Sequence, residues 1–231
     1  MASPTREISV INLGPTEYKA CWDLQRRLSD QRLSGEVGDL LLLTEHSHVY
    51  TIGKSGSDDH LLAGEEELKA KGIPVYHNDR GGDITYHGPG QLVGYPILDL
   101  RNYYLDLHRY LRDLEEVIIR TLAAYGVKSS RDSKYTGVWV GDEKICALGV
   151  KTSRWITMHG FALNVNTDLS YFRRIVPCGI RGKGVTSLGL VLGREVGLDE
   201  VAGMVSAEFG RVFGSGIRMG SPAELETADI C

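Results

Sequence analysis

The chain has 231 residues, of which 42% are hydrophobic, and a formal net charge of -4 at pH 7. This length fits one large domain or two small ones, and such a domain can fold without disulfides or structural metals. The negative charge argues against a nucleic-acid-binding protein, which normally carries a basic surface. No apolar run approaches the roughly 18 residues of a membrane-spanning helix, and the N-terminal residues lack the apolar core of a signal peptide. We therefore expect a cytoplasmic protein, or one of an organelle matrix if the source is eukaryotic.

The first half of the chain alternates a helix with short strands. Residues 17–33 predict a helix because Cys21, Leu24 and Leu28 recur on one face, which favours a core position for Cys21. Short apolar or alternating runs predict strands at residues 39–44, 49–52, 84–86 and 92–98.

The clearest helix is predicted at residues 105–125, where one apolar stripe ends before Gly126. Further strands are predicted at residues 137–140, 144–150 and 155–165, and a last helix at residues 198–213. Neither a linker nor an internal repeat interrupts the chain. Because strand pairs and single helices are mixed, the fold class is α+β, with a mixed β-sheet packed against helices.

The four cysteines, Cys21, Cys146, Cys178 and Cys231, do not show the close pairing of a zinc site. Disulfides are not expected in a reducing compartment, so each thiol either packs or reacts. Cys146 alternates with its neighbours in a predicted strand, which favours packing. Cys178 lies between a proline and a glycine, on a bend whose backbone N–H groups could stabilise an oxyanion. From its residue type alone, Cys178 is either a nucleophile or a buried loop cysteine.

The most unusual segment is RGGDITYHGPGQ at residues 80–91. Its glycines allow close backbone approach to a ligand, while Arg80, Asp83 and His87 supply hydrogen-bond donors and acceptors. It lacks the Gly-Lys-Ser/Thr end of a P-loop and the glycine spacing of a dinucleotide site. The segment is therefore either a ligand-binding wall or a polar strand between glycine-rich loops.

Two later segments carry single polar residues in predicted strands. Lys144 follows a predicted turn, where a lysine is ordinarily solvated. His159 is either a hydrogen-bonded structural histidine or a pocket residue, and Gly160 beside it can mark the close approach of a ligand or of another backbone.

Taken together, five segments resemble the lipoyl(octanoyl) transferase family: RGGDITYHGPGQ at 80–91, TGVWV at 136–140, KICALG at 144–149, HGFALN at 159–164 and VPCGI at 176–180. The likeness is strongest across residues 40–188 and implies that residues 1–231 form a single catalytic domain. It also implies a fold like that of the catalytic domains of biotin and lipoate protein ligases. Two departures are Ser47-His48, where relatives often have Pro-Pro, and Asp83, at a position that varies.

The resemblance implies that an octanoyl or lipoyl group passes from acyl carrier protein to a specific lysine of a lipoyl domain. The acceptors would be E2 subunits of 2-oxoacid dehydrogenases and the glycine cleavage H protein, in the first step of endogenous protein lipoylation. Cys178 matches the cysteine that forms the thioester, and Lys144 matches the lysine that activates it. A nearby ammonium favours thiolate, so the pair suits this chemistry. No ATP, metal or redox cofactor is required, and neither nucleic acid nor membrane is an expected partner.

The resemblance assigns substrate contacts to three runs of residues: Arg80, Gly81, Gly82, Asp83, Ile84, Thr85, Tyr86 and His87; Ala147, Leu148 and Gly149; and Gly160, Phe161 and Ala162. Since acyl carrier proteins are acidic, we also expect a basic patch near the pocket. The candidates flank Cys178 in the sequence: Arg173, Arg174, Arg181 and Lys183.

Three other functions remain open at this stage. An ATP-dependent lipoate protein ligase on the same fold would not need Cys178. A transferase that moves octanoyl between lipoyl domains would also use a cysteine, so only its donor distinguishes it. A catalytically silent acyl-binding protein or scaffold would have lost Cys178 or Lys144, and both are present.

Overall fold

The computed structural model describes residues 6–176 and 183–227. The strands of its main sheet are β1 (Glu7–Thr16), β2 (Asp39–His46), β6 (Gln91–Ile97), β7 (Ser130–Arg131), β8 (Val138–Val140), β9 (Glu143–Ser153), β10 (Ile156–Asn164), β11 (Gly184–Val185) and β12 (Gly216–Gly220). Their order is β12-β1-β2-β6-β10-β9-β8-β7, and β11 pairs with β9. The sheet is mixed, because β1 runs parallel to β2 whereas β6 runs antiparallel to β2 and β10.

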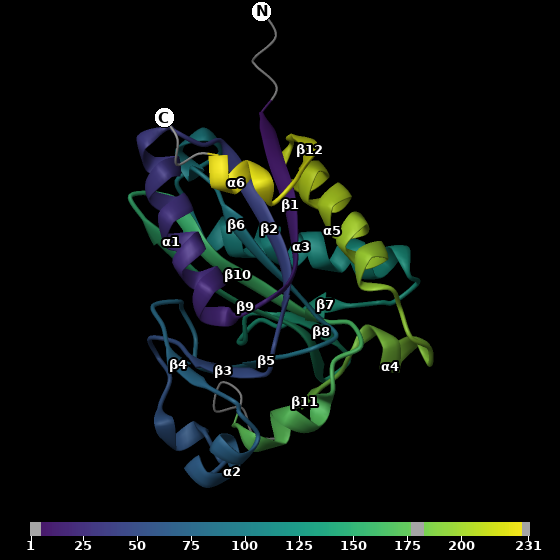
Figure 1. The fold of residues 1–231 in the computed structure, drawn as a ribbon. Helices are drawn as coiled ribbons and strands as arrows, with labels where there is room; N and C mark the ends of the chain where they lie inside the picture. The colour runs from purple at the N-terminus through teal and green to yellow at the C-terminus, as the bar shows by residue number, and fades with distance from the viewer. Residues whose placement is uncertain (1–5, 177–182, 228–231) are drawn as a thin grey trace, which may run out of the picture.

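Helices cover both faces of the main sheet (Figure 1). One face carries α1 (Tyr18–Ser34) and the short α6 (Ala223–Thr227), while α3 (Leu107–Ala124) and α5 (Leu198–Phe213) lie against the other. The helix α3 begins at Asp106, whose carboxylate accepts a hydrogen bond from the backbone of Arg109 at 3.0 Å. The sheet divides the apolar core into two layers, one between each of its faces and the helices that cover it. Every residue of β10 is buried as a result.

A smaller sheet in the order β4-β3-β5 lies below the main one in Figure 1. Its strands are β3 (Val49–Ile52), β4 (Val75–His77) and β5 (Ile84–His87). Around it lie α2 (Glu65–Ala70), η1 (Asp58–His60) and η3 (Leu169–Arg174). A separate apolar cluster, which includes Tyr50, Tyr86 and Phe172, joins this sheet to η3.

The predicted α+β class is confirmed, and each helix and strand predicted from the pattern is present with ends shifted by three residues or fewer. The sequence patterns did not predict β1 and β12, which form the edge beside α5, nor the short elements β4, β7, β11, α2, α6 and α4 (Leu188–Leu192). In β1 the apolar residues Ile8, Val10 and Ile11 are buried, but Gly14 and Pro15 break the pattern. None of the described helices is long and apolar enough to cross a membrane.

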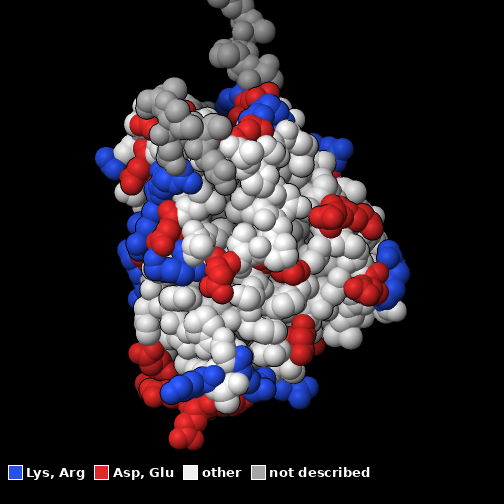
Figure 2. All heavy atoms as spheres, in the orientation of Figure 1, with Lys and Arg blue, Asp and Glu red and all other residues white. Residues whose placement is uncertain are grey.

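The surface carries both signs of charge. On the face drawn in Figure 2, cations gather along the edge where α1 lies, and acidic side chains gather at the lower end around α2. Acidic residues Glu65, Glu66 and Glu67 begin α2, where they complement the positive end of the helix dipole.

Candidate functional site

A cavity of about 360 Å³ lies between β9 and β10 of the main sheet and β5 with its preceding loop. Every residue predicted to contact substrate lines it except Tyr86, and so does Lys144. His159, for which a structural role and a pocket role were both open, lines the cavity as well. The remaining lining residues were not predicted and come from distant parts of the chain: Tyr18, Val93, Tyr95, Leu107, Leu111, Lys134, Tyr135, Thr136, Val150, Phe172 and Val185. Taken over the whole cavity, most of the lining surface is apolar, as in many small-molecule sites.

The predicted nucleophile Cys178 lies in residues 177–182, outside the described residues. The described chain reaches the cavity before and after that segment, at Phe172 and at Val185. On one side, the backbone N–H of Val176 donates to the carbonyl of His60 at 2.8 Å. On the other side, Val185 pairs with Lys144 where β11 joins β9, and its side chain lines the cavity. The described residues that line the cavity thus include one six residues before Cys178 and one seven residues after it, Phe172 and Val185.

Lys144 is buried, with only 8% of its surface exposed. Its ammonium lies 4.9 Å from the centre of the Trp139 ring, which stabilises the cation. Gly137 has a φ of +141° and leaves room for the lysine stem, since a Cβ there would lie 3.1 Å from Cε of Lys144. The TGVWV and KICALG segments thus build one buried lysine site, and the alternative of a solvated hairpin lysine was wrong.

A second ammonium lies near the same ring. Nζ of Lys183 is 4.6 Å from the centre of Trp139 and forms an ion pair with Asp132 at 2.6 Å. Two cations therefore lie at the Trp139 ring: Lys144, which lines the cavity, and Lys183, the first described residue after the Cys178 segment. A positive environment of this kind favours a thiolate over a thiol.

Arg80 holds the glycine-rich loop in shape. Its guanidinium donates to both the carbonyl and the hydroxyl of Thr51, at 2.7 and 3.0 Å, and to the carbonyl of Asp83 at 2.7 Å. These buried, charge-assisted bonds fix the turn between Arg80 and β5. The side chain also lines the cavity, so it supports the wall that it helps to form.

A pair of glycines brings the loop against the main sheet. Gly149 and Gly160 lie directly opposite each other in β9 and β10. A Cβ on Gly149 would lie 2.8 Å from the carbonyl oxygen of Gly81, and one on Gly160 would lie 2.1 Å from that of Gly94. The loop needs this space because the N–H of Gly81 donates to the carbonyl of Val150 at 2.9 Å.

The ends of the RGGDITYHGPGQ and HGFALN segments form one buried hydrogen-bond network. His87 contacts Oε1 of Gln91 through Nδ1 at 2.8 Å, and the amide of Gln91 donates to Asn164 at 2.9 Å. Asn164 in turn donates to the carbonyl of Thr186 at 3.0 Å, just beyond β11. The network joins the loop wall, the strand wall and the chain that follows the Cys178 segment. Burial lowers the pKa of His87 to about 3, so its ring is neutral near pH 7.

Tyr86 does not line the cavity, contrary to the prediction. Side chains alternate along β5, so its ring faces away from Thr85 and His87. It stacks on Tyr171 at 4.9 Å, and its hydroxyl lies 2.6 Å from Nδ1 of His48. His48, one of the two residues that stand in place of Pro-Pro, therefore packs beside η3 and completes an aromatic stack.

His159 occupies a backbone conformation that is rare for a residue in a strand. Its φ is +57°, and its buried N–H donates to the side chain of Gln25 in α1 at 2.9 Å. The ring contacts Asp79 at 2.9 Å, and Asp79 also binds Lys151 at 2.6 Å. Burial lowers the pKa of His159 to about 4, although Asp79 opposes the shift. For Asp79, burial alone would raise the pKa. The hydrogen bonds from Lys151 and His159 have the larger effect and lower the pKa to about 2.

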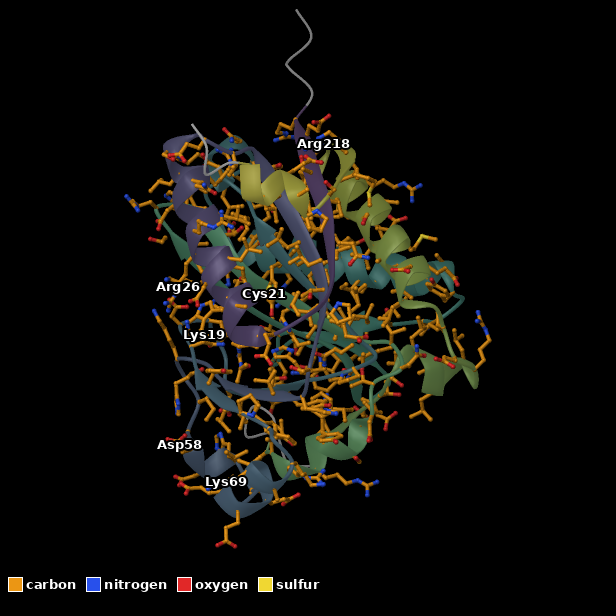
Figure 3. All side chains as sticks on the ribbon, viewed as in Figure 1. Lys19, Cys21, Arg26, Asp58, Lys69 and Arg218 are labelled. Carbon is orange, nitrogen blue, oxygen red and sulfur yellow. The ribbon has the colours of Figure 1, made fainter. Side chains whose placement is uncertain are left out.

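The described cysteines are packed, as predicted. Cys146 is fully buried in the core beside α3, and burial raises the pKa of its thiol. Cys21 points from α1 toward the sheet (Figure 3), and burial raises its pKa to about 12. Neither thiol lines the cavity. Within residues 6–176 and 183–227, no group of three or more His, Cys, Asp and Glu side chains is arranged to hold a metal ion.

Sequence relatives cover nearly the whole chain. A protein of Rubrobacter xylanophilus named octanoyltransferase is 58% identical over 203 residues, which are 87% of this chain and 91% of that protein. Another protein of that name, from Christiangramia forsetii, is 52% identical over 225 residues, which are 90% of this chain and 96% of that protein.

Solved structures with low sequence identity share the fold. A lipoate-protein ligase A bound with ATP matches with a TM-score of 0.77 at 18% identity, over 97% of this chain and 95% of that one. The biotin protein ligase of Aquifex aeolicus matches more distantly, with a TM-score of 0.51 at 13% identity, over 91% of this chain and 70% of that one. The predicted relation to both ligase folds is confirmed. Residues 17–210 also match the model of the lipoyl protein ligase A/B catalytic domain, and the chain belongs to that family.

Proposed function

We propose that this protein is an octanoyltransferase, which moves an octanoyl group from acyl carrier protein to a lipoyl-domain lysine through a thioester on Cys178. The observation that carries the proposal is the cavity, which is lined by the buried Lys144 and, on either side of Cys178 in the sequence, by Phe172 and Val185. The names of relatives that are 52% and 58% identical support the same activity.

The cavity suits the acyl chain, because its lining is largely apolar and includes Val93, Leu148 and Phe161. Its polar groups are concentrated around Lys144 and the loop of Arg80. An octanoyl chain would therefore lie among the apolar side chains with its carbonyl toward Lys144. The volume of about 360 Å³ falls in the range of ligand cavities.

In the first half of the proposed reaction, the thiolate of Cys178 attacks the carbonyl carbon of the octanoyl thioester on the carrier. The bond from that carbon to the carrier sulfur breaks, and the Lys144 ammonium gives its proton to the departing thiolate. In the second half, neutral Lys144 takes a proton from the incoming lysine amine, whose nitrogen attacks the Cys178 thioester. The amide forms, the Cys178 thiolate is released, and Lys144 is again an ammonium.

The proposed acceptors are lipoyl domains. A structural relative with a TM-score of 0.76 is described as an archaeal bipartite lipoate protein ligase with its E2 lipoyl domain. The glycine cleavage H protein is the other proposed acceptor. The proposed reaction belongs in a compartment that holds acyl carrier protein, namely the cytoplasm or an organelle matrix.

The basic patch that we propose for binding the carrier has fewer unpaired cations than the sequence of this chain suggests. Arg174 forms an ion pair with Glu67, and Lys183 forms one with Asp132, both at distances below 3 Å. Arg181 lies outside the described residues. Lys134 is exposed and lines the cavity, so it joins Arg173 as a candidate contact for an acidic carrier.

A donor comparison tests the proposal against the two other enzymes. The protein is mixed with an apo lipoyl domain and one of three donors: octanoyl-acyl carrier protein, octanoate with ATP, or an octanoylated lipoyl domain. We expect octanoylation of the acceptor, read by intact mass, from the carrier without ATP. Labelling only with octanoate and ATP would make the protein a ligase, and labelling only from the second lipoyl domain would make it an interdomain transferase.

A further inference from the structure

The chain that leads to Cys178 is held by a short antiparallel contact with the residues after η1. Leu61 and Ile175 form a β-bridge. The N–H of Leu62 donates to the carbonyl of Arg174 at 2.8 Å, and Val176 donates to the carbonyl of His60 at the same distance. The position of η1 therefore sets the position of Val176, two residues before Cys178.

His60 also reaches the cavity wall through its side chain. Its Nδ1 lies 2.6 Å from Oδ2 of Asp83, which lines the cavity. The two atoms are at ion-pair distance without the alignment of a hydrogen bond. Asp83 is 9% exposed and His60 is 31% exposed, so the contact is largely shielded from water.

Asp83 is itself fixed within the loop wall. Its other carboxylate oxygen accepts from the N–H of Ile84 at 2.7 Å, and its carbonyl accepts from the Arg80 guanidinium. A movement of Asp83 would therefore move the loop with it. His60 is the one described residue whose backbone contacts Val176 while its side chain contacts the loop wall.

We propose that His60 is a positioning residue, which fixes the distance between the cavity wall at Asp83 and Val176, two residues before Cys178 in the sequence. This inference rests on the proposed function, because it assigns a role relative to the Cys178 thioester. His60 does not line the cavity, so it acts through Asp83 and Val176 rather than on the substrate. Its effect should fall on the acylation step more than on donor binding, because near-attack geometry is sensitive to small displacements.

The test uses single-turnover acylation of the full chain by octanoyl-acyl carrier protein, followed by intact mass at a series of protein concentrations. The maximal rate reports positioning, and the half-saturating concentration reports donor binding. We expect His60→Leu to lower the maximal rate about tenfold with the half-saturating concentration changed less than about twofold. His60→Asn places an amide nitrogen near the position of Nδ1. We expect its maximal rate of acylation to remain within about threefold of that of the unmodified protein.

A matched control is available in the same part of the molecule. His77 contacts Asp58 at 2.8 Å, and Asp58 belongs to the same short helix as His60. Asp58 lies on the outside of this region in Figure 3, and neither partner lines the cavity. We expect His77→Leu to acylate at the unmodified rate. A second readout is alkylation of Cys178 by iodoacetamide, which needs no acyl pocket and should differ less than about twofold between His60→Leu and the unmodified protein.

Three results would overturn the positioning role. They are an unchanged maximal rate in His60→Leu, equal losses in His60→Leu and His60→Asn, and alkylation that slows in proportion to acylation. Absence of any adduct on the unmodified protein would instead overturn the proposed function, and the positioning role with it.

Discussion

One wall of the cavity is formed by β9 and β10, and the opposite wall by the loop that begins at Arg80 and by β5. The strand wall is held by regular backbone pairing, with Gly149 opposite Gly160 in register. Over its first residues the loop wall has only irregular backbone hydrogen bonds, in which Lys54 and Ser55 donate to the carbonyls of Arg80 and Gly82 at 3.0 and 3.2 Å. Side chains reinforce it, chiefly the Arg80 guanidinium and the contact of Asp83 with His60.

This difference separates two kinds of mutational effect. On the strand wall, a substitution of Lys144 removes its ammonium group but leaves the backbone hydrogen bonds of β9 in place. On the loop wall, a change in Arg80 removes side-chain bonds that reinforce the irregular backbone pairing of the wall. We therefore expect substitutions on the strand wall to separate activity from stability, and substitutions on the loop wall to change both.

The largest effect is expected at Lys144. Lys144→Met keeps an unbranched side chain beneath Trp139 but removes the group that handles the protons. The maximal rate of octanoyl transfer should fall by about 10² to 10⁴, the usual contribution of a general acid–base. Lys183→Met is the matched control, since its ammonium lies over the same ring. Equal losses in both variants would assign the effect to the positive charge around Trp139 rather than to proton transfer.

On the loop wall, Arg80→Lys should change stability as well as activity. A lysine ammonium cannot reproduce the forked contacts with Thr51 and Asp83. We expect the free energy of unfolding, measured with urea, to fall by about 2 kcal/mol and the KM for the octanoyl donor to rise. Arg120→Lys, at an exposed pair with Glu116, should change stability by less than about 0.5 kcal/mol. A fully stable Arg80→Lys would show that the loop wall holds its shape without these bonds.

Acidification should weaken both walls, because His87 on β5 and His159 on β10 are buried and neutral. Burial lowers their pKa values to about 3 and about 4, whereas an unfolded histidine has a pKa of about 6.5. The unfolded chain therefore binds more protons between these values, so stability is complete above about pH 6.5 and is lost as the pH falls toward 4. Each histidine contributes at most about 1.4 kcal/mol per pH unit.

Urea unfolding at pH 7, 6 and 5 measures that loss. His87→Gln should reduce the pH dependence, because its side chain stays neutral throughout. If the free energy of unfolding changes equally with pH in the unmodified protein and in this variant, protonation of His87 does not destabilise the folded state.

The smallest effect is expected where the two walls touch. Gly149→Ala places a methyl group 2.8 Å from the Gly81 carbonyl, so the loop must shift and stability should fall by about 1 kcal/mol. Gly203 in α5 has open space around the position of a Cβ. Gly203→Ala should therefore raise the melting temperature, because alanine is the better helix former. If Gly149→Ala is as stable as the unmodified protein, the loop is not packed on β9 as described.

Sequence patterns predicted the helices and strands whose apolar residues repeat, such as α3 and β10. The resemblance to the lipoyl(octanoyl) transferases, rather than any single pattern, indicated about half of the residues that line the cavity. Tyr86 is the exception in its run, because its ring packs on Tyr171 outside the cavity, although Ile84, two residues earlier in the same strand, lines it.

Other contacts left no local signal in the sequence. Tyr18 and Tyr95 meet at the cavity from elements far apart in the chain, and the partners of Asp79 and His60 lie in other elements. Only the tertiary arrangement brings such pairs together. The position of Cys178 remains a prediction, because it lies outside the described residues.

The central claim is the thioester on Cys178. The most direct measurement is intact mass of the unmodified protein and of Cys178→Ser after incubation with octanoyl-acyl carrier protein. We expect one octanoyl adduct on the unmodified protein, removed by neutral hydroxylamine and absent from Cys178→Ser. An adduct that persists in Cys178→Ser, or an unmodified protein that transfers octanoyl to a lipoyl domain without forming any adduct, would contradict the claim.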